Sequence, residues 1–188
     1  MSGKTDQAGE ELRSDESLMT AVRDGDFVAF EALVLRHQRM VWSVAFRFLG
    51  DAIEAEDVAQ EAFLRILQAA PRYEVVARFR SYLLGIVSRL CNDRVAKKRP
   101  AYVQDLPDPA DGQEPPLALM TESECRVDVR RALANLPPNQ RMAIILRYYG
   151  DMTYAEIAVM LETTPKAVER LLARGRALLQ AALRPLLE

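Results

Sequence analysis

Apolar residues recur along the chain at the three- and four-residue spacing of amphipathic helices, not at the two-residue spacing of a half-buried strand. This pattern predicts helices in the first half of the chain over residues 18–23, 26–50, 51–71 and 81–98. The apolar positions assigned to the inner side of the longest one are Phe27, Phe30, Val34, Val41, Ala45 and Phe48. Asp26 and Asp51 are suitable N-caps, Asp51 in a D-x-x-E capping box, and Gly50 is a suitable helix end. Together these elements predict a compact helical bundle.

Residues 100–120 are rich in proline, acidic and small residues. Such a segment can neither continue a helix nor build a core, so it is predicted to be a linker. A T-x-x-E capping box at Thr121 then predicts the start of another helix. Pro137 and Pro138 predict the end of that helix and the start of the next, which Gly150 closes.

The end of the chain has the pattern of a helix-turn-helix. Thr153 and Glu156 form a capping box for a short helix, a turn follows at Glu162 and Thr163, and Thr164 caps the last helix. The basic side chains of that last helix are Lys166, Arg170, Arg174 and Arg176. Spacings of four place several of them on one outward stripe, as expected of a helix that contacts DNA. An ordinary solvated helix surface would show the same spacing.

Charge is distributed in blocks that the net charge of −2 conceals. Residues 72–99 carry eight basic and two acidic side chains, and residues 125–188 carry ten basic and six acidic ones. Residues 1–71 and 100–124 are acidic overall. Two basic blocks between acidic stretches indicate two nucleic-acid contacts, or else a set of solvated helix faces.

Several classes of protein are excluded. No apolar run approaches the length of a membrane span, and the polar N-terminus lacks a secretory signal, so a cytoplasmic protein with a disordered tail over residues 1–14 is expected. Cys91 and Cys125 lie far apart without a CxxC partner and are expected to be buried, small apolar residues. His37 is the only histidine. It belongs to no nucleophile or metal pattern, so no enzyme, cofactor or metal is expected.

Three segments, in the correct order, resemble the extracytoplasmic-function (ECF) sigma factors, the minimal branch of the sigma-70 family. The polymerase-binding region of that family resembles DGDFVAFEALVLRHQRMVWSVAFRFLGDAIEAEDVAQEAFLRIL (24–67). Its minus-ten region resembles FRSYLLGIVSRLCNDRVAKKR (79–99). Its minus-thirty-five region resembles ALANLPPNQRMAIILRYYGDMTYAEIAVML (132–161), together with the helix that follows.

The resemblance implies an all-α fold of two small helical domains. Sigma region 2 would occupy residues 15–99 and sigma region 4, with its helix-turn-helix, residues 121–188. A flexible, acidic, proline-rich linker over residues 100–120 would join them.

The resemblance also implies three binding surfaces. Core RNA polymerase is expected to bind a polar rim around a small apolar patch, formed by Ile53, Asp57, Gln60, Glu61 and Leu64. Cations for phosphates and an aromatic ring for bases are expected to meet the minus-ten element. These residues are Arg78, Arg80, Tyr82, Arg89, Asn92 and Lys97, next to a base-capturing loop at 72–78. The major groove of the minus-thirty-five element is expected to meet Lys166, Glu169, Arg170, Ala173 and Arg174, with Thr153 and Tyr154 near phosphates.

The chain departs from the usual family pattern at a few positions of these surfaces. Tyr82 replaces a common tryptophan, Leu84-Gly85 a common Tyr-Arg pair, and Arg89 a common asparagine. In the last helix, Glu169 and Leu171 replace common basic residues. These changes leave the promoter sequence and the efficiency of strand opening undetermined. Because glycine inside a helix costs roughly 1 kcal/mol relative to alanine, Gly85 is expected to mark a close backbone approach.

The implied function is that of a sigma factor with core polymerase and promoter DNA as partners, an anti-sigma protein as a further partner, and no small-molecule substrate. One alternative is a sigma-like decoy that titrates an anti-sigma protein, and the motif E-D-V-A-Q-E at 56–61 argues against it. The other is a stand-alone helix-turn-helix regulator, which would need a ligand pocket or a dimer surface in residues 15–99.

Overall fold

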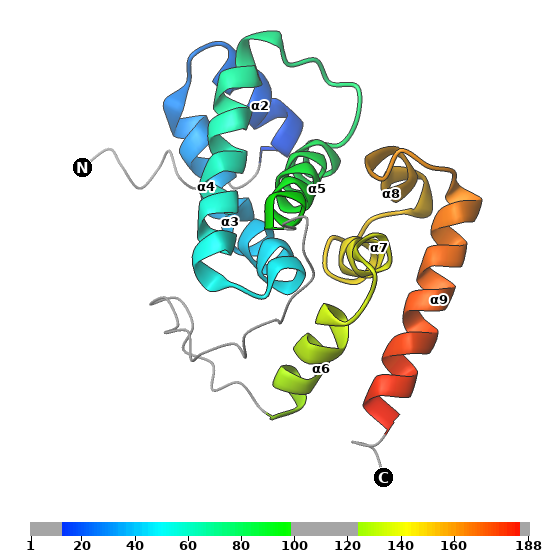
Figure 1. The fold of residues 1–188 in the computed structure, drawn as a ribbon. Helices are drawn as coiled ribbons and strands as arrows, with labels where there is room; N and C mark the ends of the chain where they lie inside the picture. The colour runs from blue at the N-terminus through cyan, green and yellow to red at the C-terminus, as the bar shows by residue number, and fades with distance from the viewer. Residues whose placement is uncertain (1–12, 99–123, 185–188) are drawn as a thin grey trace.

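The computed structural model describes residues 13–98 and 124–184, and this part of the chain is helical with no strand (Figure 1). The N-terminal part holds α2 (Asp15–Arg23), α3 (Phe27–Leu49), α4 (Ala52–Ala69), the 3-10 turn η1 (Ala70–Arg72) and α5 (Phe79–Lys98). The C-terminal part holds α6 (Glu124–Ala134), α7 (Pro138–Tyr148), α8 (Tyr154–Met160) and α9 (Pro165–Leu183). The predicted all-α fold is confirmed.

The predicted helix ends of the N-terminal part are formed by the expected side chains. The Asp26 carboxylate accepts from the backbone N–H groups of Val28 and Ala29, both at 3.0 Å, which satisfies two donors at the start of α3. Gly50 adopts the left-handed conformation, with φ of 76°, and so ends that helix. The Asp51 carboxylate accepts from the Glu54 N–H at 3.0 Å and opens α4.

The boundaries differ from the prediction in three places. Helix α2 begins at Asp15 instead of Leu18, because the hydroxyl of Ser14 accepts from the Ser17 N–H. Pro71 lies inside η1 and does not simply stop α4. Helix α5 begins two residues before the predicted Ser81, where a carboxylate oxygen of Glu16 accepts from the Phe79 N–H at 3.0 Å.

Phe27 was wrongly assigned to the core. Its side chain is 71% exposed, whereas Val41, Ala45 and Phe48 are buried on the same helix as predicted. Phe27 is the first residue of α3, ahead of the turns that α2 covers, so its helical spacing alone could not bury it.

The C-terminal part forms the predicted helix-turn-helix. Thr153 and Glu156 make a reciprocal capping box at the start of α8. Glu162 turns the chain with a positive φ of 50°, and the Thr164 hydroxyl accepts from the Ala167 N–H at the start of α9. Helices α7 and α9 approach closely at Gly175, where a Cβ atom would lie 3.1 Å from Cγ1 of Ile144.

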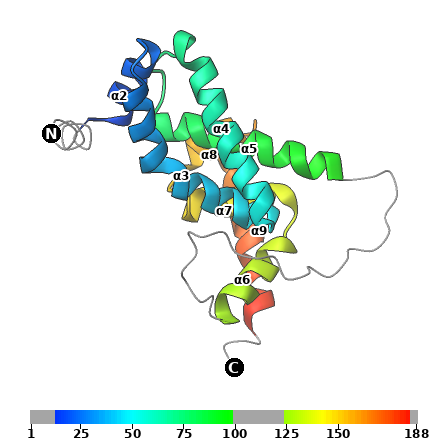
Figure 2. The same ribbon diagram turned by 90° about the vertical axis from the view of Figure 1, so that its left-hand side faces the viewer.

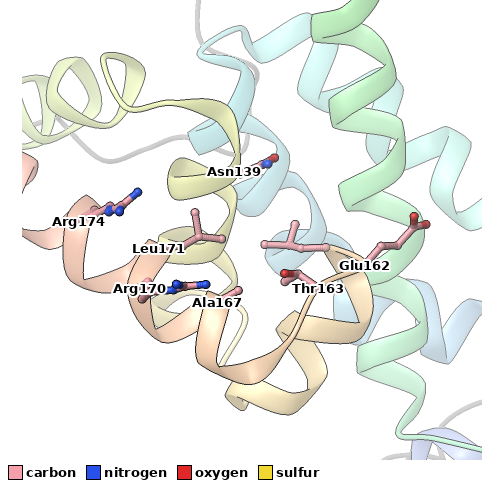
Figure 3. A pocket seen from close by; sticks show the side chains of 8 residues that line it. Asn139, Glu162, Thr163, Ala167, Arg170, Leu171 and Arg174 are labelled. Carbon is pink, nitrogen blue, oxygen red and sulfur yellow. The ribbon is translucent and has the colours of Figure 1, made fainter.

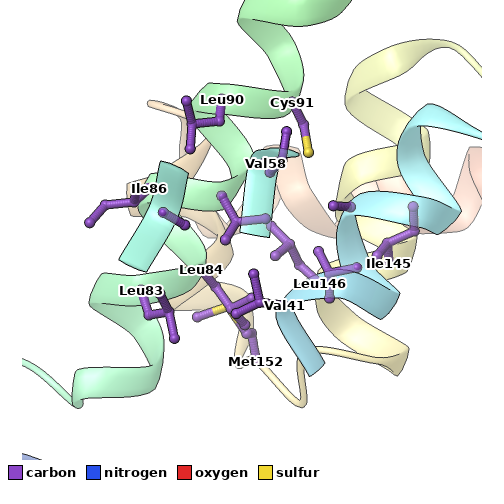
Figure 4. Packing of buried hydrophobic residues seen from close by; sticks show 14 of the residues in the cluster. Val41, Val58, Leu83, Leu84, Ile86, Leu90, Cys91, Ile145, Leu146 and Met152 are labelled. Carbon is purple, nitrogen blue, oxygen red and sulfur yellow. The ribbon is translucent and has the colours of Figure 1, made fainter. Parts of the chain in front are cut away.

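The two parts pack against each other and share one apolar core. Helix α3 contacts α6 and α7, and α5 contacts α7 and α8, an arrangement seen in both overall views (Figure 1, Figure 2). Close to the junction, Val41 and Leu84 of the N-terminal part lie among Leu146 and Met152 of the C-terminal part (Figure 4). The predicted linker, residues 1–12 of the predicted tail, Thr121 and the side chain of Cys125 lie outside the described residues. The last two residues of that tail are ordered, contrary to the prediction: Ser14 caps α2, and the backbone oxygen of Arg13 accepts from Arg36 at 3.0 Å.

Helix α2 is tied to α3 by Asp15, whose carboxylate contacts Arg36 at 2.6 Å and the Nε2 atom of His37 at 2.8 Å. Burial alone would raise the pKa of Asp15, but the hydrogen bonds from His37 and Arg36 outweigh it and hold this pKa below its ordinary value. A lowered carboxyl pKa stabilises the folded state above the unfolded value, near 4, and this contribution is lost as the pH falls through the folded value.

We therefore expect Asp15→Asn to lower the free energy of unfolding at neutral pH. Because Asp15 is only partly buried, solvent screening should limit the effect to about 1 kcal/mol. Chemical denaturation at several pH values checks this. The difference in the free energy of unfolding between wild type and variant should shrink below about pH 4. Asp93→Asn, which alters an exposed carboxylate on α5, is the control and should change the free energy of unfolding at neutral pH by no more than about 0.5 kcal/mol. A difference in unfolding free energy that stays constant from neutral to acid pH would contradict the lowered pKa of Asp15.

Candidate functional site

The five residues predicted to bind polymerase lie on one outward face of α4, which we call the α4 face: Ile53, Asp57, Gln60, Glu61 and Leu64. Its two apolar members are unusually exposed, with Ile53 at 76% and Leu64 at 57%. Between them, the Asp57 carboxylate pairs with Arg94 of α5 at 3.3 Å, and Glu61 pairs with Arg65 at 3.0 Å. Exposed apolar side chains beside carboxylates that are fixed by ion pairs match the composition of a reversible protein interface.

The residues predicted to meet the minus-ten element follow α5 and the loop before it. Arg78, Arg89 and Lys97 are exposed, while Arg80, Tyr82 and Asn92 are half-buried. The preceding loop is exposed except for Tyr73, whose ring lies 5.7 Å from that of Tyr82. This Tyr73–Tyr82 contact packs the loop against α5.

The residues predicted to meet the minus-thirty-five element form one exposed face of α9, which we call the α9 face: Lys166, Glu169, Arg170, Ala173 and Arg174. Arg170 and Arg174 also line a hollow of about 420 Å³ between α9, the α8–α9 turn and the start of α7 (Figure 3). Asn139 and Thr163 add polar groups to this hollow. The guanidinium groups are therefore accessible from outside and are not used in the core.

The two residues predicted to lie near phosphates, at the start of α8, already make contacts within the protein. The Thr153 N–H donates to Glu156 at 2.8 Å, and its hydroxyl both donates to that carboxylate and accepts from the Glu156 N–H. The ring of Tyr154 lies 5.8 Å from the guanidinium of Arg147. Thr153 remains a predicted phosphate neighbour whose own polar groups are already hydrogen-bonded within the protein.

Cysteine and histidine have structural roles in the described part of the chain. Cys91 is fully buried as expected, and burial raises the pKa of its thiol to about 12, so it is not a nucleophile. His37 is 7% exposed and pairs with Asp15. Within residues 13–98 and 124–184, no cluster of three His, Cys, Asp or Glu side chains could hold a metal ion. No helix there is long and apolar enough to cross a membrane.

The structure forms two long-range polar contacts at these surfaces that the sequence did not indicate. Arg94 holds Asp57 of the α4 face, 37 residues away, and Ser81 of α5 donates to Glu156 of α8 at 2.6 Å across 75 residues. Neither pairing leaves a local pattern in the sequence, because both partners are common surface residues. The close backbone approach expected at Gly85 is not formed: the nearest atom to a Cβ placed there is the side-chain Cγ of Met160, at 4.0 Å, which is an ordinary van der Waals contact.

Comparisons with known proteins cover both parts of the chain. Sequence profiles of sigma-70 region 2 and sigma-70 region 4 match residues 33–100 and 126–179. The ECF sigma factor SigW of Bacillus subtilis is 30% identical over 88% of this chain and 94% of its own length. The ECF sigma-E factor of Escherichia coli K12 is 30% identical over 94% and 98%.

Solved structures show the same fold. CnrH in complex with the cytosolic domain of CnrY aligns with a TM-score of 0.69 and 24% identity, over 92% of this chain and 99% of that one. The sigma factor RpoE of Bartonella quintana, in complex with the anti-sigma factor NepR, aligns with a TM-score of 0.63 and 19% identity, over 82% and 96%. With both regions matched in order and relatives that align over nearly their whole length, this chain belongs to the ECF branch of the sigma-70 family.

Proposed function

We propose that this protein binds core RNA polymerase through the α4 face and directs it to promoters with the surfaces of α5 and α9. The observation that carries the proposal is the exposure of three surfaces, of which one is apolar and acidic and two are cationic. As in other sigma factors, the chemistry of RNA synthesis belongs to the polymerase, so the chain itself acts as an initiation factor. A decoy or a stand-alone regulator is not favoured, because the matched relatives are sigma factors along nearly their whole length.

The proposal extends to the compartment in which the protein acts and to the protein that restrains it. The protein would act in the cytoplasm, where polymerase and promoter DNA are found. An anti-sigma protein would restrain it, by analogy with the complex of RpoE with NepR. Its promoters would belong to a stress or envelope-signal response.

Reconstituted transcription tests the proposal. The full chain is mixed with sigma-free bacterial core polymerase and a pool of genomic promoter fragments, and the transcripts are sequenced. Discrete start sites that share an upstream two-box motif are expected. Measurable binding to the polymerase without initiation would favour the decoy, and absence of binding would reject the proposal.

The α9 face is expected to determine the upstream box. Arginine can donate two hydrogen bonds to one guanine, and each such contact contributes about 1–3 kcal/mol of discrimination. Arg170→Ala should therefore lower initiation roughly tenfold or more and relax the base preference at one position of that box. Competitive transcription from promoters randomised in the box checks this. Arg131→Ala on α6, whose side chain is 76% exposed, is a matched control and should keep the preference. Equal losses for both variants would indicate a general loss of charge instead.

A further inference from the structure

The loop over residues 73–78 enters α5 through a capping contact that comes from α2 and not from the loop itself. The carbonyl of Arg78, the residue before α5, accepts from the Tyr82 N–H, so Arg78 occupies the cap position. An arginine side chain has no acceptor and cannot bind the free N–H groups of the first helical turn. A carboxylate oxygen of Glu16 accepts from the Phe79 N–H instead, at 3.0 Å and across 63 residues.

Helix α2 makes further contacts at both ends of this loop. Where the loop ends, the Phe79 ring is buried 5.4 Å from the ring of His37, which Asp15 of α2 binds at 2.8 Å. Where the loop begins, α2 contacts η1, and Tyr73 is buried. Burial and the nearby Glu16 charge both raise the pKa of the Tyr73 phenol, which places this carboxylate close to the first residue of the loop as well. Helix α2 therefore supports the loop at both of its ends.

Between its two ends the loop arches away from the helices and has little support of its own (Figure 1). Residues 74–78 are all exposed, and Val75 and Val76 reach 59% and 87%. Within 74–78 the structure shows one backbone hydrogen bond, from the Val76 N–H to the Glu74 oxygen at 2.9 Å. Arg78 adds an exposed cation. An apolar tip beside a cation is suited to an unstacked base and its phosphate.

We propose that Glu16 is a positioning residue for promoter recognition: by fixing the point at which the loop enters α5, it sets the base preference of that loop. This inference rests on the proposed function, in which the surface of α5 contacts the promoter. A binding constellation has to be held to within about 0.5 Å, and a loop reaches this precision only when other elements support it. Glu16 is half-buried beneath the start of α5, so it acts through the loop and not by contact with DNA.

Amide hydrogen exchange of the free full-length chain, followed by NMR, tests the capping contact. In Glu16→Ala the Phe79 N–H loses its acceptor and should exchange roughly tenfold faster. Glu16→Gln should keep most of the protection, because its amide oxygen can accept the same hydrogen bond. Glu31→Ala removes an exposed carboxylate of α3 and should leave the exchange of Phe79 as in wild type. Equal exchange of Phe79 in Glu16→Ala and wild type would overturn the proposal.

Competitive transcription from a promoter pool randomised in the minus-ten box tests the functional role. Boxes with the preferred base gain from the loop, whereas boxes with other bases do not. If one loop in ten keeps the recognition geometry in Glu16→Ala, the preference should fall up to tenfold, with unchanged binding to core polymerase. Because the preference is a ratio measured within one reaction, a smaller amount of folded protein cannot change it. Glu16→Gln should restore the preference, and an unchanged preference in Glu16→Ala would contradict the proposal.

A combined variant shows whether Glu16 acts through the loop. Val75→Ser with Val76→Ser alters two exposed side chains, so it should leave the fold intact and lower the same base preference. Adding Glu16→Ala should then cause little further loss, because both changes disable one element. Additive losses, or an unchanged preference in the Val75→Ser, Val76→Ser variant, would refute the role of Glu16. A wild-type protein that selects no shared two-box motif would reject the proposed function instead.

Discussion

Replacing both Ile53 and Leu64 with glutamate is expected to abolish binding to core polymerase while leaving the fold intact. Both side chains are more than half exposed, so a charge at either position costs the folded protein little. In an interface, by contrast, the same two charges would be buried against an apolar partner surface. Two central contacts of this kind contribute about 3 kcal/mol or more together, which corresponds to a loss of affinity of about 100-fold.

The measurement is a titration of labelled protein with core polymerase, paired with circular dichroism to verify the helical content. Val28→Glu with Leu35→Glu is the matched control, because these two apolar residues of α3 are 53% and 60% exposed and lie outside the α4 face. The control should bind like wild type. If it loses as much affinity as the α4 variant, the loss reflects added negative charge, and the α4 face is not the polymerase-binding surface.

Replacing Phe48 with alanine is expected to cause the largest loss of stability among single substitutions near the junction. Its ring is 1% exposed, and large-to-small changes of a buried phenylalanine cost about 3–5 kcal/mol. The Arg141 guanidinium lies 5.5 Å from this ring and also donates to the backbone oxygen of Phe48. The cavity would therefore loosen both α3 and the turn that leads into α7.

Chemical denaturation followed by circular dichroism measures this loss. Because domains of this size have a free energy of unfolding of about 5–15 kcal/mol, the predicted loss should shift the denaturation midpoint clearly. Phe27→Ala is the control: it removes the same side chain from the same helix at a position that is 71% exposed. Its effect should stay within about 0.5 kcal/mol. Similar losses for the two variants would mean that Phe48 does not belong to a shared core.

Much of the local structure could be predicted because its causes are local. Caps at Asp26, Asp51 and Thr153 act within three residues, so a short pattern contains both partners. The residues of the α4 and α9 faces could likewise be grouped, since helical spacing puts them on one side. Helical spacing does not say what each face binds. The hypothesis about the binding partners came from the resemblance to sigma factors.

The contacts between distant segments could not be predicted. Leu84 was noted only as a departure from the family pattern, and Gly85 was expected to mark a close backbone approach. The structure buries both of them on α5, the helix that contacts α7 and α8 of the C-terminal part. The exposure of Phe27 was missed because a helical stripe does not say where the covering helix ends. Packing of the two parts depends on shape complementarity across more than 60 residues of sequence, and periodicity carries no information on it.

The hydrogen bond between Glu16 and the start of α5 has a consequence for the order in which the protein folds. Its partners are 63 residues apart, so the loop they close must form before the first turn of α5 gains its acceptor. During synthesis, α2, α3 and α4 leave the ribosome before α5 does. The N-terminal helices can therefore assemble first and act as a template on which α5 nucleates, with Glu16 already in place to receive Phe79. A helix predicted to touch promoter DNA would then begin where α2, the first helix of the described part of the chain, supplies an acceptor.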